Sequence, residues 1–490
     1  MMRAWLKQGF YRYFFQVVAG GCLLPFVVLA FYSHPALDDF SIGEQLRTRS
    51  VGAYAAEVYW HSSGRYASSL SSVAIQYFGR HPSAYQWLVL AGLLGLVAGL
   101  YLAAAAAVPA GGAHLASGIG SVLVVATLLN FPKPADSIYW LTGEVAYLYP
   151  VALVAVLVAV LAWLAARPRG RGRWLAWVAA VGLAAYLPGF SEITALLLPL
   201  VVVGMGVALR PRRVASGWVA VAAALLAGSL LTLGTPAHHG QWQALEHPVA
   251  VGLTAGRAAL HVAYSVVNWL GNGLLPLWLL LALPLSVAFT QAAGRGGLVQ
   301  RLTGPVWLWP LLTLAGLWLS FFFYQLAMHD GLVPRVKNLL YLYFVAGCVL
   351  SAHAAYRRLP AHYRAVLLAA PMRAGLGLWL LVAFLADHNP SLLPQGAGQG
   401  CNAVVQAYRD WLSGDAARYD QQQRARAAQV RTAAPATLPG AAPLRLDPLR
   451  TLPRSLFYAD ISPNPAAWPN VGYANFLYYP AAVYVAEPGP

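Results

Sequence analysis

Two adjacent carboxylates, Asp38 and Asp39, directly follow the first apolar run of the chain. Carboxylates side by side repel when both are ionised, so the pKa of one should rise. A raised pKa suits a general base, and the other carboxylate could orient it or bind a divalent cation such as Mg²⁺ or Mn²⁺. We expect Asp39 to be the base and Asp38 its partner or metal ligand. The alternative is that both are solvated loop residues at a membrane surface.

Three basic residues are candidates for binding an anionic phosphate. Arg335 and Lys337 lie in VPRVKN at the start of a long apolar run, and Arg65 lies in the segment SSGRY. A guanidinium offers a planar fork of donors that matches phosphate oxygens. The alternative is that these side chains reach toward the membrane surface only to keep their charges in water.

Aromatic and acidic residues are candidates for holding a sugar ring or an acceptor. Tyr139 and Trp140 precede Glu144, Trp60 lies in YWHSSGRY, and Glu192 follows a Pro-Gly break. Aromatic faces suit the apolar face of a sugar, but they also form anchoring belts at membrane interfaces. Glu192 could alternatively cap the helix that it precedes.

The composition requires lipid as the solvent for much of this chain. Its 490 residues are 59% hydrophobic and 10% charged, with a mean hydropathy of +0.57, whereas soluble domains carry about 25% charged residues. We predict an all-α polytopic membrane protein with about eleven transmembrane helices, since each run is long enough to span a bilayer. The runs are 17–32, 85–108, 113–131, 146–166, 174–188, 193–209, 216–233, 274–290, 306–326, 337–356 and 366–386.

The distribution of charge predicts the orientation. Arginines gather in short loops after the fourth, sixth, eighth and tenth runs, as the positive-inside rule expects for an N-terminus in the cytoplasm. Residues 33–84 then form a long first outer loop, and residues 234–272 an outer loop with an interfacial helix. All sixteen acidic residues fall on the outer side or at outer helix ends. The net charge of +16 is explained by these loops, so we expect no nucleic-acid partner.

The chain divides by composition into a transmembrane domain, residues 1–386, and a polar extracytoplasmic domain, residues 387–490. Within the second we expect an amphipathic helix over 403–430, a linker over 431–453, and short strands in LFYADI and AAVYVAE. The second domain should therefore be a soluble domain of α/β type. Usage rich in Ala and Arg suggests a bacterium, which would make the location its inner membrane.

Other familiar chemistry has no motif in this sequence. His238, His239 and His247 share one loop, but their spacing is no recognised zinc pattern. No P-loop, GxGxxG, GxSxG or HExxH motif occurs. The sequence therefore shows no recognised motif for binding a nucleotide.

The acid pair after the first helix, in a long first outer loop, resembles the GT-C superfamily of integral-membrane glycosyltransferases. Further segments resemble an uncharacterised bacterial family of GT-C-like membrane proteins; they are DDFSIG, WHSSGRY, SIYWLTGEVAYLYP, PGFSE, VPRVKN and NPAAWPNVGYANFLYY. The resemblance implies a GT-C-like fold and a polyprenyl-phosphate or -pyrophosphate sugar donor. It also implies transfer to a glycan, lipid or protein acceptor on the outer face, with Asp38 and Asp39 matching the catalytic acid motif.

Two other classes of function remain open from the sequence. The chain could be a flippase or exporter of a lipid-linked glycan, although neither internal repeats nor mid-membrane charges are evident. It could also be a non-catalytic scaffold of the cell envelope. An enzyme predicts that Asp38, Glu144, Glu192 and Arg335 converge on one site, whereas a scaffold does not.

Overall fold

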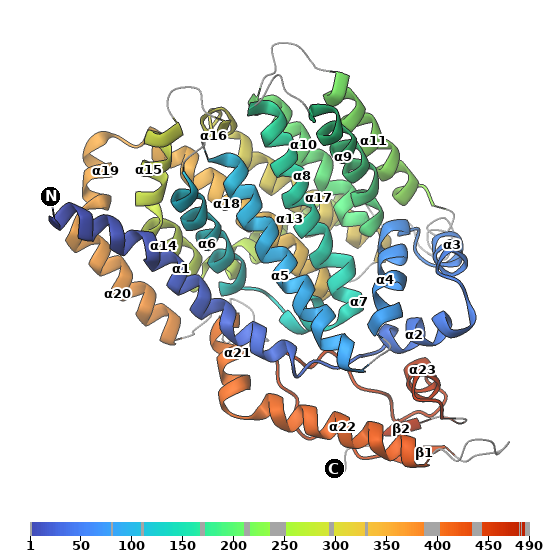
Figure 1. Cartoon of the computed structure of the whole chain (residues 1–490). Helices are drawn as coiled ribbons and strands as arrows, with labels where there is room; N and C mark the ends of the chain where they lie inside the picture. The colour runs from blue at the N-terminus through green and yellow to red at the C-terminus, as the bar shows by residue number, and fades with distance from the viewer. Residues whose placement is uncertain are drawn as a thin grey trace.

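A computed structural model gives the fold of this mostly helical chain (Figure 1). It describes residues 2–79, 82–108, 112–166, 172–209, 216–235, 251–293, 298–328, 332–386, 402–433, 443–479, 481 and 483–485. The histidines at 238, 239 and 247 lie outside these ranges.

Within the described ranges, eight spans are long and apolar enough to cross a membrane, and the chain is a multi-pass membrane protein. Their helices are α1 (Met2–Ala30), α5 (Pro82–Ala107), α8 (Tyr149–Ala166), α9 (Arg173–Tyr186), α10 (Glu192–Leu209), α11 (Ser216–Leu233), α17 (Leu308–Met328) and α18 (Pro334–Arg358). Helix α6 (Ala113–Leu129) is apolar but shorter.

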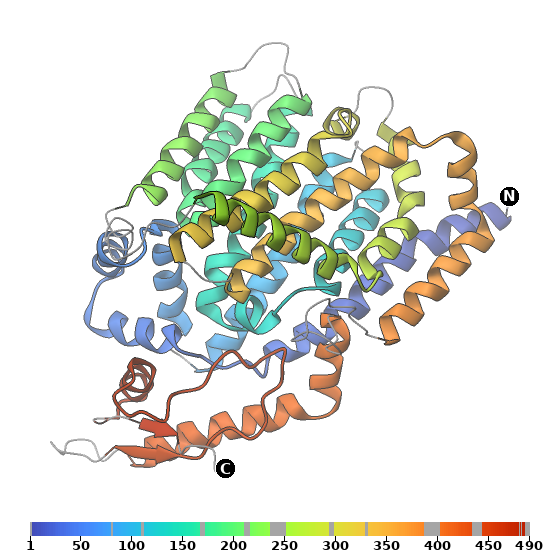
Figure 2. The same ribbon diagram turned by 180° about the vertical axis from the view of Figure 1, so that it is seen from behind.

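Two further pairs of helices would each make one span, for a total of ten, if each bent pair crosses as a unit. They are α13 (Val251–Leu270) with α14 (Leu274–Leu281), and α19 (Ala361–Leu368) with α20 (Ala370–Ala386), each bent by 60°. Helix α13 packs on α17 and crosses it steeply (Figure 2). The described part therefore has eight to ten candidate spans, where the sequence predicts about eleven.

Proline and glycine explain the broken helices. The predicted run 274–290 is divided into α14 and α15 (Leu283–Ala293), followed by the short α16 (Leu298–Leu302). Pro284 stands at the start of α15; a proline has no N–H and cannot continue the preceding helix. Gly273, in the left-handed region at φ 74°, separates α13 from α14.

The first long loop is folded into three helices, α2 (Asp38–Thr48), α3 (Val51–His61) and α4 (Tyr66–Gly79). Ser50 caps α3 by accepting a hydrogen bond from the Ala53 N–H at 3.3 Å. Together with the C-terminal segment, α2 covers one end of the helical bundle, which we call the tail face (Figure 1).

The predicted α/β-type C-terminal domain is not found in the described residues, which form helices and only two short strands. The helices are α21 (Ala403–Leu412), α22 (Asp415–Ala433) and α23 (Trp468–Phe476). Strands β1 (Leu444–Leu446) and β2 (Val483–Val485) pair in parallel. AAVYVAE thus contains a strand, whereas LFYADI does not, and β1 falls in the predicted linker.

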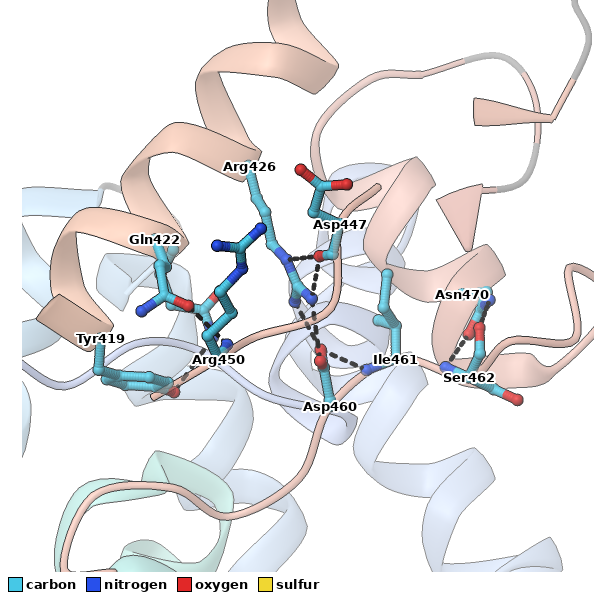
Figure 3. Close-up of polar contacts among 10 residues, drawn as sticks. Tyr419, Gln422, Arg426, Asp447, Arg450, Asp460, Ile461, Ser462 and Asn470 are labelled. Atoms are coloured by element: carbon cyan, nitrogen blue, oxygen red, sulfur yellow. Dashed lines mark hydrogen bonds and ion pairs between the residues drawn. The ribbon is translucent and has the colours of Figure 1, made fainter. Parts of the chain in front are cut away.

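The tail packs closely on the start of the chain. Arg47 of α2 donates hydrogen bonds to the carbonyls of Asn475 and Phe476, at 2.6 and 2.5 Å. His34 hydrogen-bonds to Asp420 of α22 at 2.8 Å. Buried Arg426 ties α22 to later parts of the tail (Figure 3). These contacts hold the tail against the residues that flank the acid pair.

Between α6 and α8 the chain makes two π-helical turns around one turn of α-helix. They are η1 (Ala135–Tyr139), α7 (Leu141–Gly143) and η2 (Glu144–Leu148); a 3₁₀ turn, η3 (Leu187–Phe190), precedes α10. Single π turns inside helices often mark functional sites because they redirect side chains. The segment 135–148 carries several of the predicted site residues.

Candidate functional site

Asp39 is a buried, fully hydrogen-bonded carboxylate. Its Oδ1 accepts from the Thr142 N–H and hydroxyl at 3.0 and 2.6 Å. Its Oδ2 accepts from the Tyr85 hydroxyl at 2.8 Å and the Ala36 N–H at 3.2 Å. Burial raises the pKa of Asp39 to about 6, although these hydrogen bonds oppose the rise. Such a carboxylate joins α2 to α5 and α7 and offers no free oxygen to a substrate.

Asp38 is only half-buried and occupies the first turn of α2. Burial raises the pKa of its carboxyl, and attraction to Arg335 and Arg65 opposes the rise. The preceding residue, Leu37, has φ 44°, which is strained for a residue with a branched side chain. Strained backbone of this kind tends to occur where function requires a fixed side-chain direction.

Arg65 and Glu192 form a bidentate ion pair. Arg65 Nε donates to both carboxylate oxygens at 3.0 and 3.1 Å, and Nη2 donates at 2.9 Å. The side chains are 28% and 11% exposed. Glu192 raises the pKa of Arg65 overall, although burial alone would lower it. The pair joins the first loop to the start of α10, so the fork of Arg65 is already occupied by a carboxylate.

Arg335 lies among charged and polar residues that we call the polar cluster. Its members are Asp38, Arg65, Lys133, Asp136, Tyr147, Glu192, Arg335 and Tyr458. The Arg335 Nη1 donates to the Tyr458 hydroxyl at 3.0 Å, and its guanidinium carbon lies 5.6 Å from the centre of the Trp140 ring. Tyr147 interacts with the guanidinium groups of both Arg335 and Arg65. Asp38 therefore interacts with two guanidinium groups from distant parts of the sequence, Arg65 of the first loop and Arg335 of α18.

A second ion pair belongs to this cluster. Lys133 Nζ lies 2.9 Å from Asp136 Oδ1, and Asp136 also interacts electrostatically with Arg335. Asn338 donates to the Lys133 carbonyl at 2.7 Å and to Ser137 Oγ at 2.8 Å, which fastens α18 to η1. In the described part of the chain, Asp38 and Arg335 have no partner at ion-pair distance, whereas the neighbouring charges are paired.

Glu144 and the aromatic residues before it are buried. Glu144 is 0% exposed and packs against Gly92 of α5, with no hydrogen-bond donor at either oxygen. Tyr139 is 2% exposed and donates to the Phe26 carbonyl at 3.1 Å. Trp140 is 4% exposed and donates to the Ala36 carbonyl at 3.1 Å. None of the three presents an open surface to a substrate in this conformation.

Two predicted residues lie away from the cluster. Lys337 follows Arg335 by two positions, about 200° around an α-helix, so the two point to different sides of α18. Lys337 is exposed and interacts with His261 of α13. Trp60 is 54% exposed on α3, with its ring against Tyr59. The predicted site thus gathers Asp38, Arg65, Glu192 and Arg335, but not Lys337 or Trp60.

An apolar cavity of about 390 Å³ lies within the bundle. Its lining comes from α5, α6, α8, α10, α14, α15, α16, α17 and α18. Val151 and Leu339 line it, and each lies one helical turn beyond a residue of the polar cluster, Tyr147 and Arg335 respectively. The cavity therefore begins about one turn from the charged groups.

Tyr147, Tyr458, Lys133 and Asp136 belong to the cluster but were not predicted as site residues. Tyr147 and Asp136 share a short aromatic and acidic segment with Trp140, which is a usable signal. Tyr458 comes from the tail, 123 residues after Arg335, and no spacing rule would associate the two.

Comparisons of the chain with known protein families, curated proteins and solved structures find no match. The helices and their composition therefore support a multi-pass helical membrane protein, and the function must be argued from the site itself.

Proposed function

We propose that the chain is a membrane glycosyltransferase that moves a sugar from a polyprenyl-phosphate or -pyrophosphate donor to an acceptor. The observation that carries the proposal is that Asp38 and Arg335 lie near enough to interact electrostatically. These two groups interact but have no partner at ion-pair distance in the described residues, and an apolar cavity begins one helical turn away. A potential base, an anion-binding group and a space for a lipid chain are thus adjacent.

The cavity suits the lipid part of such a donor. Its volume of about 390 Å³ is within the usual range of roughly 300–1,000 Å³ for ligand pockets. Because Leu339 and Arg335 lie on the same side of α18, a chain in the cavity would direct its phosphate toward Arg335. In this proposal Arg335 binds the phosphate alone among the three predicted basic residues, since Arg65 is paired and Lys337 points elsewhere.

The proposed reaction is a direct displacement at the anomeric carbon. Asp38 accepts the proton of an acceptor hydroxyl, and that oxygen forms the new bond to the anomeric carbon. The bond from that carbon to the phosphate oxygen breaks, and polyprenyl phosphate leaves with the bonding electrons. Arg335 stabilises the negative charge of the leaving phosphate. We assign the base to Asp38, instead of Asp39, because Asp39 already accepts four hydrogen bonds.

The residues present do not form an evident divalent-cation site. The described part of the chain contains no group of three or more His, Cys, Asp or Glu side chains that could hold a metal ion. Asp39 has donors on both oxygens, and Asp38 has arginines as its charged neighbours. Our proposal therefore gives the positive charge to Arg335 and routes no step through a metal.

The proposed setting is the outer face of a bacterial inner membrane, with the tail face outside and a GT-C-like arrangement of helices. The arginine-rich loops that support this orientation fall largely outside the described residues. Reporter fusions at Arg171 and Ala433 test it, since the first should read cytoplasmic and the second external. A cytoplasmic reading at Ala433 would contradict the proposed side of action.

The test of function uses the full chain in nanodiscs with undecaprenyl phosphate glucose, radiolabelled in the sugar, and envelope lipid and glycan extracts as acceptors. Transfer of label should occur with the natural chain, and Arg335→Gln should reduce donor binding at least about tenfold, because charged hydrogen bonds are worth roughly 1.5–3 kcal/mol. Trp60→Ala, outside the cluster, is the matched control. Binding without transfer, together with movement of label across the bilayer, would favour a flippase.

A further inference from the structure

Residues before and after Tyr458 in the sequence are hydrogen-bonded to helices of the tail. Before it, the Ser455 N–H donates to Asp410 Oδ2 of α21 at 2.8 Å. After it, Asp460 receives two hydrogen bonds from Arg426 of α22, at 2.7 and 3.0 Å (Figure 3). Both Asp410 and Arg426 are buried. Hydrogen bonds therefore hold the tail on both sides of Tyr458, and none of these involves the Tyr458 side chain.

The side chain of Tyr458 enters the polar cluster of the membrane domain. Its ring stacks on Trp140, with centroids 4.1 Å apart and planes 15° from parallel. Its hydroxyl accepts a hydrogen bond from Arg335 at 3.0 Å. The Lys133 ammonium lies 5.8 Å from the ring centre. An aromatic face, a guanidinium and an ammonium thus surround one six-membered ring that carries an oxygen.

We propose that Tyr458 occupies a binding subsite for a ring that carries a phosphate, such as a glycosyl phosphate. The face of Trp140 would receive the ring, and Arg335 would receive the phosphate. The inference rests on the proposed function, since it names where the sugar of that donor binds. Tyr458 uses a hydrogen-bond donor of Arg335 and covers one face of the Trp140 indole. A glycosyl phosphate would use the same donor for its phosphate and the same face for its sugar ring.

The stacking distance leaves no room for a ligand between the two rings. Rings 4.1 Å apart are in van der Waals contact, so no sugar ring fits between Trp140 and Tyr458. A ligand on this face of Trp140 must displace Tyr458. Rotation of the Tyr458 side chain would suffice, because the ties at Ser455 and Asp460 do not involve it.

Binding to variants of the full chain in detergent tests the proposal. Affinities for glucose 1-phosphate and for undecaprenyl phosphate glucose are measured by titration calorimetry. Tyr458→Ala should bind both about tenfold more tightly, since the ligand no longer displaces a stacked ring and a hydrogen bond. Tyr458→Phe, which keeps the ring, should gain less, about threefold. Tyr478→Ala removes another tail tyrosine, one that stacks on Arg47, and should change neither affinity.

The outcomes separate this proposal from the proposed function. A gain for glucose 1-phosphate alone would support the subsite but contradict a lipid-linked donor. Weaker or unchanged binding in a well-folded Tyr458→Ala would overturn the subsite, because Tyr458 would then be part of the wall. Absence of binding in every variant would also overturn it. Elution as a single species and an unchanged melting temperature establish that each variant is folded, and Tyr458→Phe provides a milder change if the alanine variant misfolds.

Discussion

The ion pair between Arg65 and Glu192 gives the sharpest prediction about stability. At 2.9 Å and an effective dielectric constant of about 20, the gross attraction is about 6 kcal/mol. Desolvation of two mostly buried groups offsets a large part of it. Removing one partner leaves the other charge unpaired, so Arg65→Met or Glu192→Leu should each lower the free energy of unfolding by about 2–4 kcal/mol.

A double-mutant cycle measures the pair itself. The double variant Arg65→Met with Glu192→Leu should recover most of either single loss, with a coupling energy of about 2–3 kcal/mol. The assay is reversible unfolding of the full chain in mixed micelles of dodecyl maltoside and SDS. The control cycle is Asp415 with Arg418, an exposed pair (36% and 54%) on α22, whose coupling should be below about 1 kcal/mol.

This cycle also decides what Arg65 does. If Arg65 is structural, the double variant should fold and bind undecaprenyl phosphate glucose as tightly as the natural chain. Loss of donor binding in a stable double variant would show that Arg65 contacts the phosphate, as the sequence suggested. A coupling energy no larger than that of the exposed pair would refute the reasoning from burial and bidentate geometry.

Three more predictions follow from the same contacts. Asp38→Asn should slow sugar transfer by about 10²–10⁴-fold, the size of a general-base effect, without lowering the melting temperature; an active, folded variant would exclude Asp38 as the base. Burial raises the pKa of Asp39 from 3.8 to about 6, so the folded protein binds this proton more tightly than the unfolded chain does. The stabilisation of the folded state by this proton is complete below pH 3.8 and is lost as pH rises through about 6, a loss of about 3 kcal/mol. Asp39→Asn should remove that dependence from unfolding free energies measured between pH 4 and 7, and an unchanged slope would assign it elsewhere. Arg426→Met should destabilise the tail by about 2–4 kcal/mol and speed its proteolysis, whereas Arg418→Met should not; equal rates would mean that the Asp460 pair is not structural.

The sequence predicted the membrane class because that class depends on local signals, whereas the predicted site depends on which segments are assigned to one side of the membrane. Apolar runs of spanning length are visible directly, and most of the described spans coincide with predicted runs. The approach of Asp38 to Arg65 and Arg335 followed from assigning their segments to one side of the membrane. The breaks near Pro284 and Pro371 could also have been read from the sequence, since proline interrupts helices.

The remaining features depend on contacts between distant segments. Asp39 Oδ1 accepts hydrogen bonds from Thr142, 103 residues later in the sequence. The sequence around Asp38 and Asp39 gives no sign of this contact. Glu144 was expected near a substrate, but the π turns direct it against Gly92. LFYADI has the composition of a strand, yet its Asp460 side chain pairs with Arg426 of α22, and the Ser455 N–H just before it donates to Asp410 of α21. In LFYADI the local preference for a strand is overridden by tertiary contacts.

The docking of α23 on α2 has a consequence for biosynthesis. The residues that meet there are 428 positions apart, as in the hydrogen bond from Arg47 to Asn475. Because synthesis proceeds from the N-terminus, α2 is made early and must remain without this partner while nearly all of the helical bundle is inserted. Ribosomes that stop before the tail would leave chains with inserted helices but with Arg47 unpartnered and Trp140 uncovered. Such chains would present a polar, aromatic surface that the complete protein hides, which a membrane protease could use to recognise them.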